Sequence, residues 1–199
     1  MWIVIGVIAA VVVVLALAAF AFNDMVRRRN RTAEAWSQIA VEIERRHDLI
    51  PNLVHTVKGY AAHESGTFEA VTRARVAAVD AGASKDPKAV AAAESTLSTT
   101  LRSLFAVAEA YPVLRASENF RALQEELTAT EDKLEFARRY YNASARDYNS
   151  AIQTFPRALA AKPLGFTPVG YYEVEAGTVA VPLVDFGPPA PSAIGPPDV

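Results

Sequence analysis

The sequence predicts an all-α protein with an N-terminal transmembrane helix, an antiparallel up-and-down four-helix bundle and an extended C-terminal tail. Three observations lead to this fold class. Residues 2–22 form an uninterrupted apolar run, and the segment from Ser117 to Phe155 repeats apolar residues every seven positions. Prolines at positions 51, 87, 112 and 156 divide the rest of the region into four helical segments. Short connections between such segments force neighbouring helices to run antiparallel.

The N-terminal run predicts a membrane anchor over residues 1–23. Residues 2–22 contain no charge and no hydrogen-bonding polar side chain other than the indole of Trp2. As an α-helix this stretch spans about 30 Å, the thickness of the hydrocarbon core of a bilayer. A cleaved signal peptide is the alternative, because Ala19-Phe20-Ala21 is similar to a small-x-small cleavage site. The run is longer than a usual signal-peptide core and no basic residue precedes it, which favours the anchor.

The arginines that follow the anchor predict its orientation. They are Arg27, Arg28, Arg29 and Arg31. Because no basic residue precedes the apolar run, the positive-inside rule places the N-terminus outside and the bundle in the cytoplasm. The same side chains form a lipid-facing flank, each attracted to anionic headgroups by on the order of 1 kcal/mol near the surface.

The predicted bundle comprises residues 24–156, and its first two helices are separated near Pro51. The first helix covers residues 32–46, with its apolar side chains on one face. The second covers residues 48–82, with Asp48 as N-cap and the proline in the first turn. We expect a turn there. A continuous helix with a kink is the alternative, because the heptad phase passes through this proline without slipping.

The third and fourth helices have clearer limits. The third begins after the N-cap Asp86 and stops at Tyr111-Pro112. The fourth covers Ser117–Phe155 and has large side chains at one heptad position and mostly small ones at the other, as in a coiled coil, so that a neighbouring helix can approach closely. The large series is Phe120, Leu127, Leu134, Tyr141, Tyr148 and Phe155, and the other is Leu123, Thr130, Ala137, Ser144 and Ala151.

Beyond Pro156 the composition changes. Residues 157–186 include Phe166, Tyr171, Tyr172 and Phe186, enough apolar surface for an extended segment to dock on the bundle. Residues 187–199 are rich in proline and predict a disordered tail.

The composition argues against catalysis. A formal net charge of −2 gives no electrostatic reason for nucleic-acid binding, and the absence of cysteine excludes thiolate chemistry. A di-iron bundle needs two Glu-x-x-His pairs, and only Glu44 with His47 forms one. We therefore predict no catalytic residue, cofactor, metal or small-molecule substrate.

Two polar groups are candidates for a surface that contacts a partner protein. They are Arg46, His47, Asp48 and Asn52, and Tyr140, Asn142 and Asn149. The alternative for Arg46 is that its side chain snorkels or pairs with a carboxylate at the end of the bundle. The alternative for the tyrosine-rich group, which includes the neighbouring Tyr141 and Tyr148, is ordinary burial of rings in the core.

Three stretches of the sequence resemble the LemA family, in order and over about residues 2–186. They are AWSQIAVEIERRHDLIPNLVHTVKGYAAHE (35–64), LRSLFAVAEAYP (101–112), and ENFRALQEEL with ARRYYNASARDYNSAIQTFP (118–127, 137–156). The resemblance implies a bacterial protein with one membrane anchor and an antiparallel four-helix bundle, and it implies no enzyme activity. Members in magnetosome-forming bacteria are associated with membrane shaping.

The expected function is that of a single-pass, non-enzymatic scaffold or adaptor at the bacterial inner membrane. It would act through a partner protein or through self-association, because an anchor raises the local concentration of weakly binding surfaces. Membrane remodelling by lateral assembly is the alternative, and a metal-dependent enzyme is a remote one.

Overall fold

The structure, a computed structural model, describes residues 1–173 and confirms the all-α class. Within that range the chain forms six helices and no strand. The helices are α1 (Trp2–Lys58), α2 (Ser65–Ser84), α3 (Pro87–Glu109), α4 (Pro112–Ala116), α5 (Glu118–Gln153) and α6 (Arg157–Ala161). Residues 174–186 of the predicted extended segment and the predicted tail over residues 187–199 lie outside the described residues.

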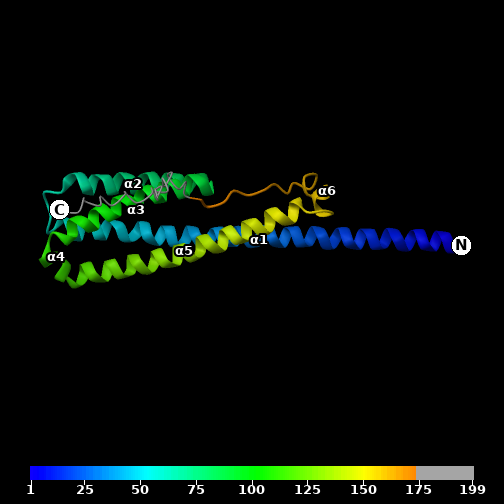
Figure 1. The fold of residues 1–199 in the computed structure, drawn as a ribbon, viewed down its shortest axis with the longest axis horizontal. Coiled ribbons are helices and arrows are strands. Elements are labelled where there is room, and N and C mark those ends of the chain that lie inside the picture. The colour runs from blue at the N-terminus through cyan, green and yellow to red at the C-terminus, as the bar shows by residue number, and fades with distance from the viewer. Residues whose placement is uncertain (174–199) are drawn as a thin grey trace, which may run out of the picture.

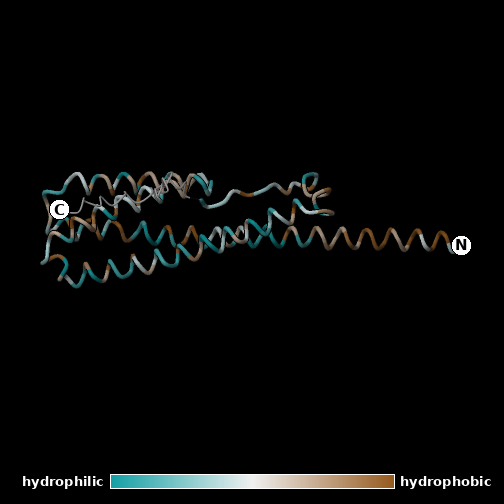
Figure 2. Tube along the Cα trace, in the orientation of Figure 1, coloured by the Kyte–Doolittle hydropathy of each residue, from teal (hydrophilic) through white to brown (hydrophobic). Residues whose placement is uncertain are grey.

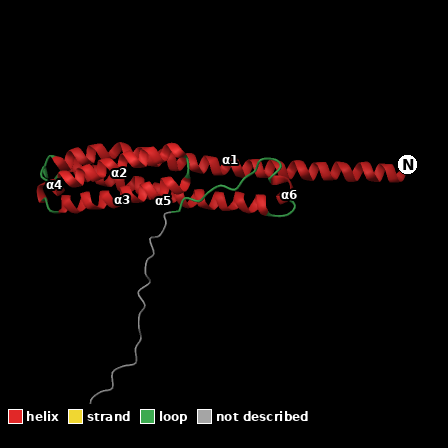
Figure 3. Cartoon of the chain, turned by 90° about the horizontal axis from the view of Figure 1, so that it is seen from above, coloured by secondary structure: helices red, strands yellow, loops and turns green. Residues whose placement is uncertain are grey.

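Four of these helices are long, run side by side and alternate in direction (Figures 1 and 3). The main contacts pair α1 with α5 and α2 with α3. All four contribute to one apolar core at the end of the bundle far from the N-terminus, for example through Leu53, Val71, Leu104 and Leu127. A second core cluster, nearer the N-terminus, involves α1, α3 and α5.

Helix α1 is a single element that extends well beyond its partners. It passes the predicted boundary at residue 23 without a break, and its N-terminal portion projects from the bundle with every residue from 1 to 20 exposed (Figure 1). Figure 2 shows that this projecting portion is the most hydrophobic part of the chain. By length and composition it is the one helix among residues 1–173 that could cross a membrane.

The expected turn at Pro51 is wrong, because α1 continues through this residue as far as Lys58. A proline in a helix cannot donate to the carbonyl four residues earlier, here that of His47. Arg75 of α2 donates its Nε–H to that His47 carbonyl at 2.8 Å and so replaces the missing bond. The Pro51 ring itself faces solvent. A neighbouring helix, rather than a break in the chain, thus accommodates the proline.

The first connection lies at residues 59–64 instead. The predicted helix over residues 48–82 therefore comprises the C-terminal end of α1 and most of α2. Gly59 ends α1, and its N–H group still bonds to the carbonyl of His55 at 3.2 Å. Ala61 in the connection is buried in the core, whereas Tyr60 is exposed. The sequence did not reveal this connection, because Ala61 keeps the apolar period of the helices: it is buried in the core although it is not helical.

The heptad pattern of α5 is largely confirmed. Of its large series, Phe120, Leu127, Leu134, Tyr141 and Tyr148 are buried. The last member, Phe155, is 77% exposed, so its predicted core position is wrong. The reason is local: α5 ends at Gln153, and a turn then redirects the chain into α6.

After α6 the chain reverses and returns along the bundle. Gly165 has φ +77°, a left-handed conformation that glycine adopts without strain. The following residues, 166–172, lie extended between α6 and the near end of α2 and α3 (Figure 1). We call this stretch the docked segment.

Candidate functional site

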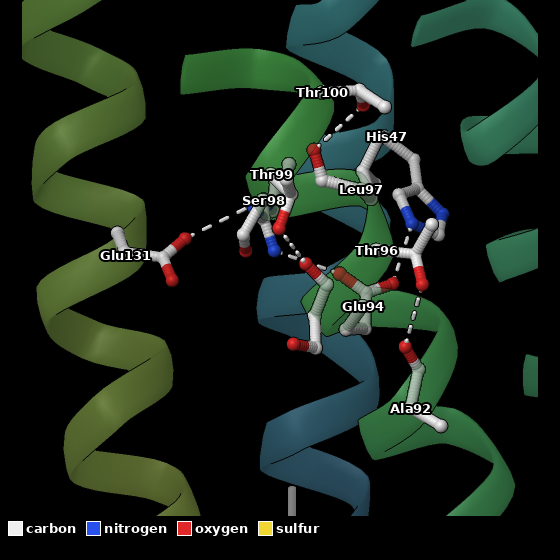
Figure 4. A network of polar contacts seen from close by, with 11 residues as sticks. His47, Ala92, Glu94, Thr96, Leu97, Ser98, Thr99, Thr100 and Glu131 are labelled. Atoms are coloured by element: carbon white, nitrogen blue, oxygen red, sulfur yellow. Dashed lines mark hydrogen bonds and ion pairs between the residues drawn. The ribbon is translucent and has the colours of Figure 1, made fainter. Parts of the chain in front are cut away.

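The most unusual feature of the bundle interior is a buried ion-pair cluster, formed by Arg46, His47, Glu94, Ser98 and Glu131. Glu94 of α3 is fully buried and Arg46 of α1 is 2% exposed. Arg46 donates from Nη1 to Glu94 Oε2 at 2.8 Å and from Nη2 to Ser98 Oγ at 2.6 Å. The other Glu94 oxygen lies 2.8 Å from His47 Nε2. Figure 4 shows Glu94 and His47 directed toward each other, with Glu131 facing them from α5.

The cluster links the four long helices. Glu131 Oε2 of α5 lies 3.4 Å from Arg46 Nε, and Arg75 of α2 donates to the backbone of His47. Each oxygen of the Glu94 carboxylate therefore has a close charged or hydrogen-bonding neighbour. A buried carboxylate in this state acts as a structural crosslink and has no free oxygen directed at a substrate.

The cluster accounts for half of the first predicted partner surface. Arg46 and His47 are buried and bonded inside the bundle. Arg46 therefore pairs with a carboxylate, as in the alternative interpretation, but in the interior of the bundle and not at its end. Asp48 and Asn52 are exposed on the same helix. Within residues 1–173 no group of three or more His, Asp or Glu side chains is placed to hold a metal ion.

Asn142 and Asn149 of α5 hold the docked segment. Asn149 donates from Nδ2 to the Val169 carbonyl and accepts from the Val169 N–H group, both at 2.9 Å. Asn142 makes the same pair of bonds with Tyr172, at 2.9 and 2.8 Å. Each side-chain amide thus bonds to both the N–H and the C=O group of one residue, as the backbone of an adjacent β-strand would. Because seven residues separate the two asparagines, both lie on one face of α5.

Two tyrosines of the core stripe reinforce this attachment. Tyr141 donates its hydroxyl to the Gly170 carbonyl at 2.8 Å, and Tyr148 donates to the Thr167 carbonyl at 3.0 Å. Their rings are buried while the hydroxyls reach the edge of the bundle. Tyr140, the remaining member of the second predicted group, is 39% exposed. The two asparagines of that group are therefore engaged within the chain.

The tyrosines beneath the docked segment have perturbed acidities. Burial raises the pKa of the Tyr172 hydroxyl to about 12, and the nearby Arg138 guanidinium partly opposes this rise. That guanidinium lies 4.9 Å from the Tyr172 ring centroid. Burial also raises the pKa of Tyr141 and of Tyr148. All three side chains favour the protonated form in the folded protein.

We predict that the protein loses stability as the pH rises above 10. An unfolded tyrosine ionises near pH 10, whereas folded Tyr172 stays protonated up to about pH 12. The folded state binds more protons in this window, so the free energy of unfolding falls by about 1.4 kcal/mol per pH unit, and the full stabilisation is present below pH 10. Urea unfolding across this range measures the slope. Tyr172→Phe should make this slope less steep without abolishing it, because the pKa values of Tyr141 and Tyr148 are raised too. Tyr60→Phe, a change at an exposed side chain, is the control.

A groove on the outer face of the bundle lies between α1 and α5. It has a volume of about 640 Å³ and is lined by Glu34, Ser37, Gln38, Val41, Glu42, Asp132, Lys133, Phe136 and Ala137. Two large apolar side chains that line the groove are exposed to solvent: Val41 is 58% exposed and Phe136 is 64% exposed. Glu42 Oε2 is buried there without a hydrogen-bond donor among residues 1–173. We call these residues the α1/α5 groove.

Sequence reasoning missed the α1/α5 groove because it searched for the core stripe. Phe136 lies next to the buried Ala137 but off the stripe, among charged neighbours such as Glu135 and Lys133. An aromatic residue at an outer heptad position, on a face that is otherwise charged, is the signal that could have identified it. Val41 offers the same signal on α1.

The predicted lipid-facing flank divides into two kinds of arginine. Arg27, Arg29 and Arg31 are exposed. Arg28 is partly buried and joins two acidic residues, with Nε 2.9 Å from Asp24 and Nη1 2.6 Å from Asp147 of α5. The hydrogen bond from Arg28 lowers the pKa of Asp24, although partial burial opposes the shift. Arg28 therefore fastens α1 to α5 where the apolar run ends.

An apolar N-terminal helix that continues into a bundle of helices defines a class of membrane-associated helical-bundle proteins. Residues 35–186 match the LemA family, and the chain belongs to that family.

Curated relatives agree with this assignment. The magnetosome protein MamQ 2 of Paramagnetospirillum magneticum is 27% identical over 189 residues, which cover 83% of this chain and 70% of the relative. MamQ of Magnetospirillum gryphiswaldense is 28% identical over 169 residues, with 73% of this chain and 62% of the relative covered. Protein LemA of Metamycoplasma hominis is 26% identical over 153 residues, covering 76% and 68%.

Proposed function

We propose that this protein is a non-enzymatic, membrane-anchored scaffold that acts by self-association of its bundle. The observation that supports this most directly is the α1/α5 groove, because it places an exposed aromatic side chain, Phe136, beside a hollow of about 640 Å³. A projecting ring and a hollow on the same patch suit a two-fold contact, in which each copy inserts its ring into the other.

The anchor makes such a contact more favourable. Each copy is anchored by its own apolar run, so all copies have the same orientation in the membrane. Their α1/α5 grooves therefore lie at the same distance from the membrane surface. Residues 34–42 follow the end of the apolar run by 12 to 20 positions, or about 18–30 Å along α1. Confinement to one surface raises the effective concentration of the facing patches. We further propose that the N-terminus lies outside and the bundle in the cytoplasm, on the basis of the arginine flank.

The polar residues of the α1/α5 groove also suit a protein surface. Carboxylates from Glu34, Glu42 and Asp132 line it together with Lys133. Across a two-fold axis Lys133 of each copy can pair with a carboxylate of the other, for example with the unbonded Glu42 Oε2. These pairs offset part of the repulsion between the facing carboxylates.

Crosslinking of single cysteines tests this proposal, since the chain has none of its own. Ser37→Cys introduces a thiol at an exposed position of the groove with little change in shape. With the full-length protein in membranes, a short bis-maleimide should give a covalent dimer. The dimer should disappear when Phe136→Asp is added.

The matched control is Ser103→Cys, the same substitution at an exposed position of α3. It should crosslink only at the rate of random collision. Equal crosslinking at positions 37 and 103, or a Ser37→Cys dimer that persists with Phe136→Asp, would contradict self-association through this groove.

A further inference from the structure

Helix α6 packs on α5 and lies beside α1 at the level where the apolar run ends. Arg157 of α6 forms an ion pair of 3.0 Å with Asp24. The ring of Phe166, just beyond α6, meets the ring of Phe22 edge to face, with 5.7 Å between centroids. Figures 1 and 3 both place α6 beside α1 at the base of the projecting portion. The depth of α6 is therefore fixed relative to the membrane-spanning stretch.

Large apolar side chains project from α6 and its flanking turns. Phe155 is 77% exposed, Leu159 is 72% exposed and Leu164 is 50% exposed. Phe20 of α1, close to the end of the apolar run, is 71% exposed. Exposed apolar side chains thus occur both at the end of the apolar run of α1 and on α6 with its flanking turns. Such a patch is unfavourable in water and marks a surface that contacts another apolar phase.

Basic side chains gather around the same level of the molecule. They are Arg27, Arg28, Arg29, Arg31, Arg157 and Lys162, whereas the acidic ones bonded to them are Asp24 and Asp147. Apolar residues next to an excess of positive charge are typical of segments that lie in the interface of a membrane with anionic lipids.

We propose that α6 and its flanking turns form a second membrane contact, distinct from the span itself. Phe155, Leu159 and Leu164 insert among the headgroups and upper acyl chains of the leaflet that faces the bundle. One span alone leaves the molecule free to tilt in any direction relative to the membrane. A second point of contact, held to α1 through Asp24 and Phe22, restricts that tilt and determines which side of the bundle leans toward the membrane surface.

Fluorescence of a single labelled cysteine tests this proposal on the full-length protein in vesicles of phosphatidylcholine and phosphatidylglycerol. Leu159→Cys is labelled with the environment-sensitive dye NBD. Insertion predicts emission at shorter wavelength than for a solvent-exposed dye, and quenching by lipids with a doxyl group close to the headgroup. Val113→Cys is the matched control: both side chains are 72% exposed and both lie in helices of five residues. Helix α4 is at the opposite end of the bundle (Figure 1).

The control dye should emit as in water and should not be quenched by the doxyl lipids. Labelled Leu164→Cys should repeat the result of Leu159→Cys, so that the conclusion does not depend on one substitution. Identical behaviour at positions 159 and 113 would overturn the proposal. So would a shift to shorter wavelength without lipid quenching, since another protein surface would then cover the patch.

Discussion

Replacing Glu94 by alanine is expected to lower the free energy of unfolding by about 3–5 kcal/mol, because it leaves the guanidinium of Arg46 buried without its main counter-charge. His47 loses its partner in the same change. Urea unfolding of the full-length protein in a mild detergent, followed by circular dichroism, measures the loss. The expected result is a lower midpoint with an unchanged slope.

Two comparisons isolate the buried charge as the cause. Glu131→Ala removes a carboxylate that is 41% exposed and 3.4 Å from the same guanidinium, and should cost about 1 kcal/mol or less. The double variant Arg46→Met with Glu94→Met removes both charges and should recover most of the stability lost in Glu94→Ala. A double variant no more stable than Glu94→Ala would show that packing volume, and not the unpaired charge, explains the loss.

The second large effect is expected from Asn142→Ala combined with Asn149→Ala. This variant loses the four hydrogen bonds between these amides and the backbone of the docked segment, and also the longer one, of 3.4 Å, from Asn149 Nδ2 to the Tyr171 hydroxyl. At about 1 kcal/mol for each backbone bond, the free energy of opening the segment falls by roughly 4 kcal/mol, which accelerates exchange of its amide hydrogens roughly 1,000-fold. Hydrogen–deuterium exchange at Val169 and Tyr172 measures this effect directly.

Asn52→Ala is the matched control for this experiment, since Asn52 is exposed and lies on α1 away from the docked segment. It should leave exchange at both positions unchanged. Amides in the core of α3, such as that of Leu104, should exchange at the wild-type rate in every variant. Faster exchange throughout the bundle would mean that the asparagines stabilise the whole fold and not the docked segment in particular.

The sequence predicted helices well where side-chain periodicity and end signals coincide. Asp86 and Pro87 predicted the start of α3, and the Asp86 side chain does accept a bond from the Lys88 N–H group at 3.1 Å. The heptad of α5 likewise predicted its buried stripe. In both places the information is local, because it depends on residues within a few turns of each other.

Prediction failed where a distant residue decides the outcome. Nothing near Pro51 reveals that Arg75 of α2 will bond to the carbonyl that this proline leaves free. Glu94 was not singled out for the same reason, because its partners Arg46 and His47 lie on another helix. The roles of Asn142 and Asn149 became evident only once the returning chain lay beside them.

Because α1 is one uninterrupted helix, a change in the direction of its N-terminal part is transmitted to the whole bundle. No glycine or proline occurs from Val7 to Ile50, and α1 continues as a helix through Pro51 to Lys58, so the helix has no break before the far loop. The part of α1 from residue 23 to residue 58 is about 54 Å long. When a thinner bilayer makes the span tilt by about 10°, the far loop at residues 59–64 swings sideways by about 9 Å. Any tilt of the N-terminal part of α1 would thereby displace the far end of the bundle.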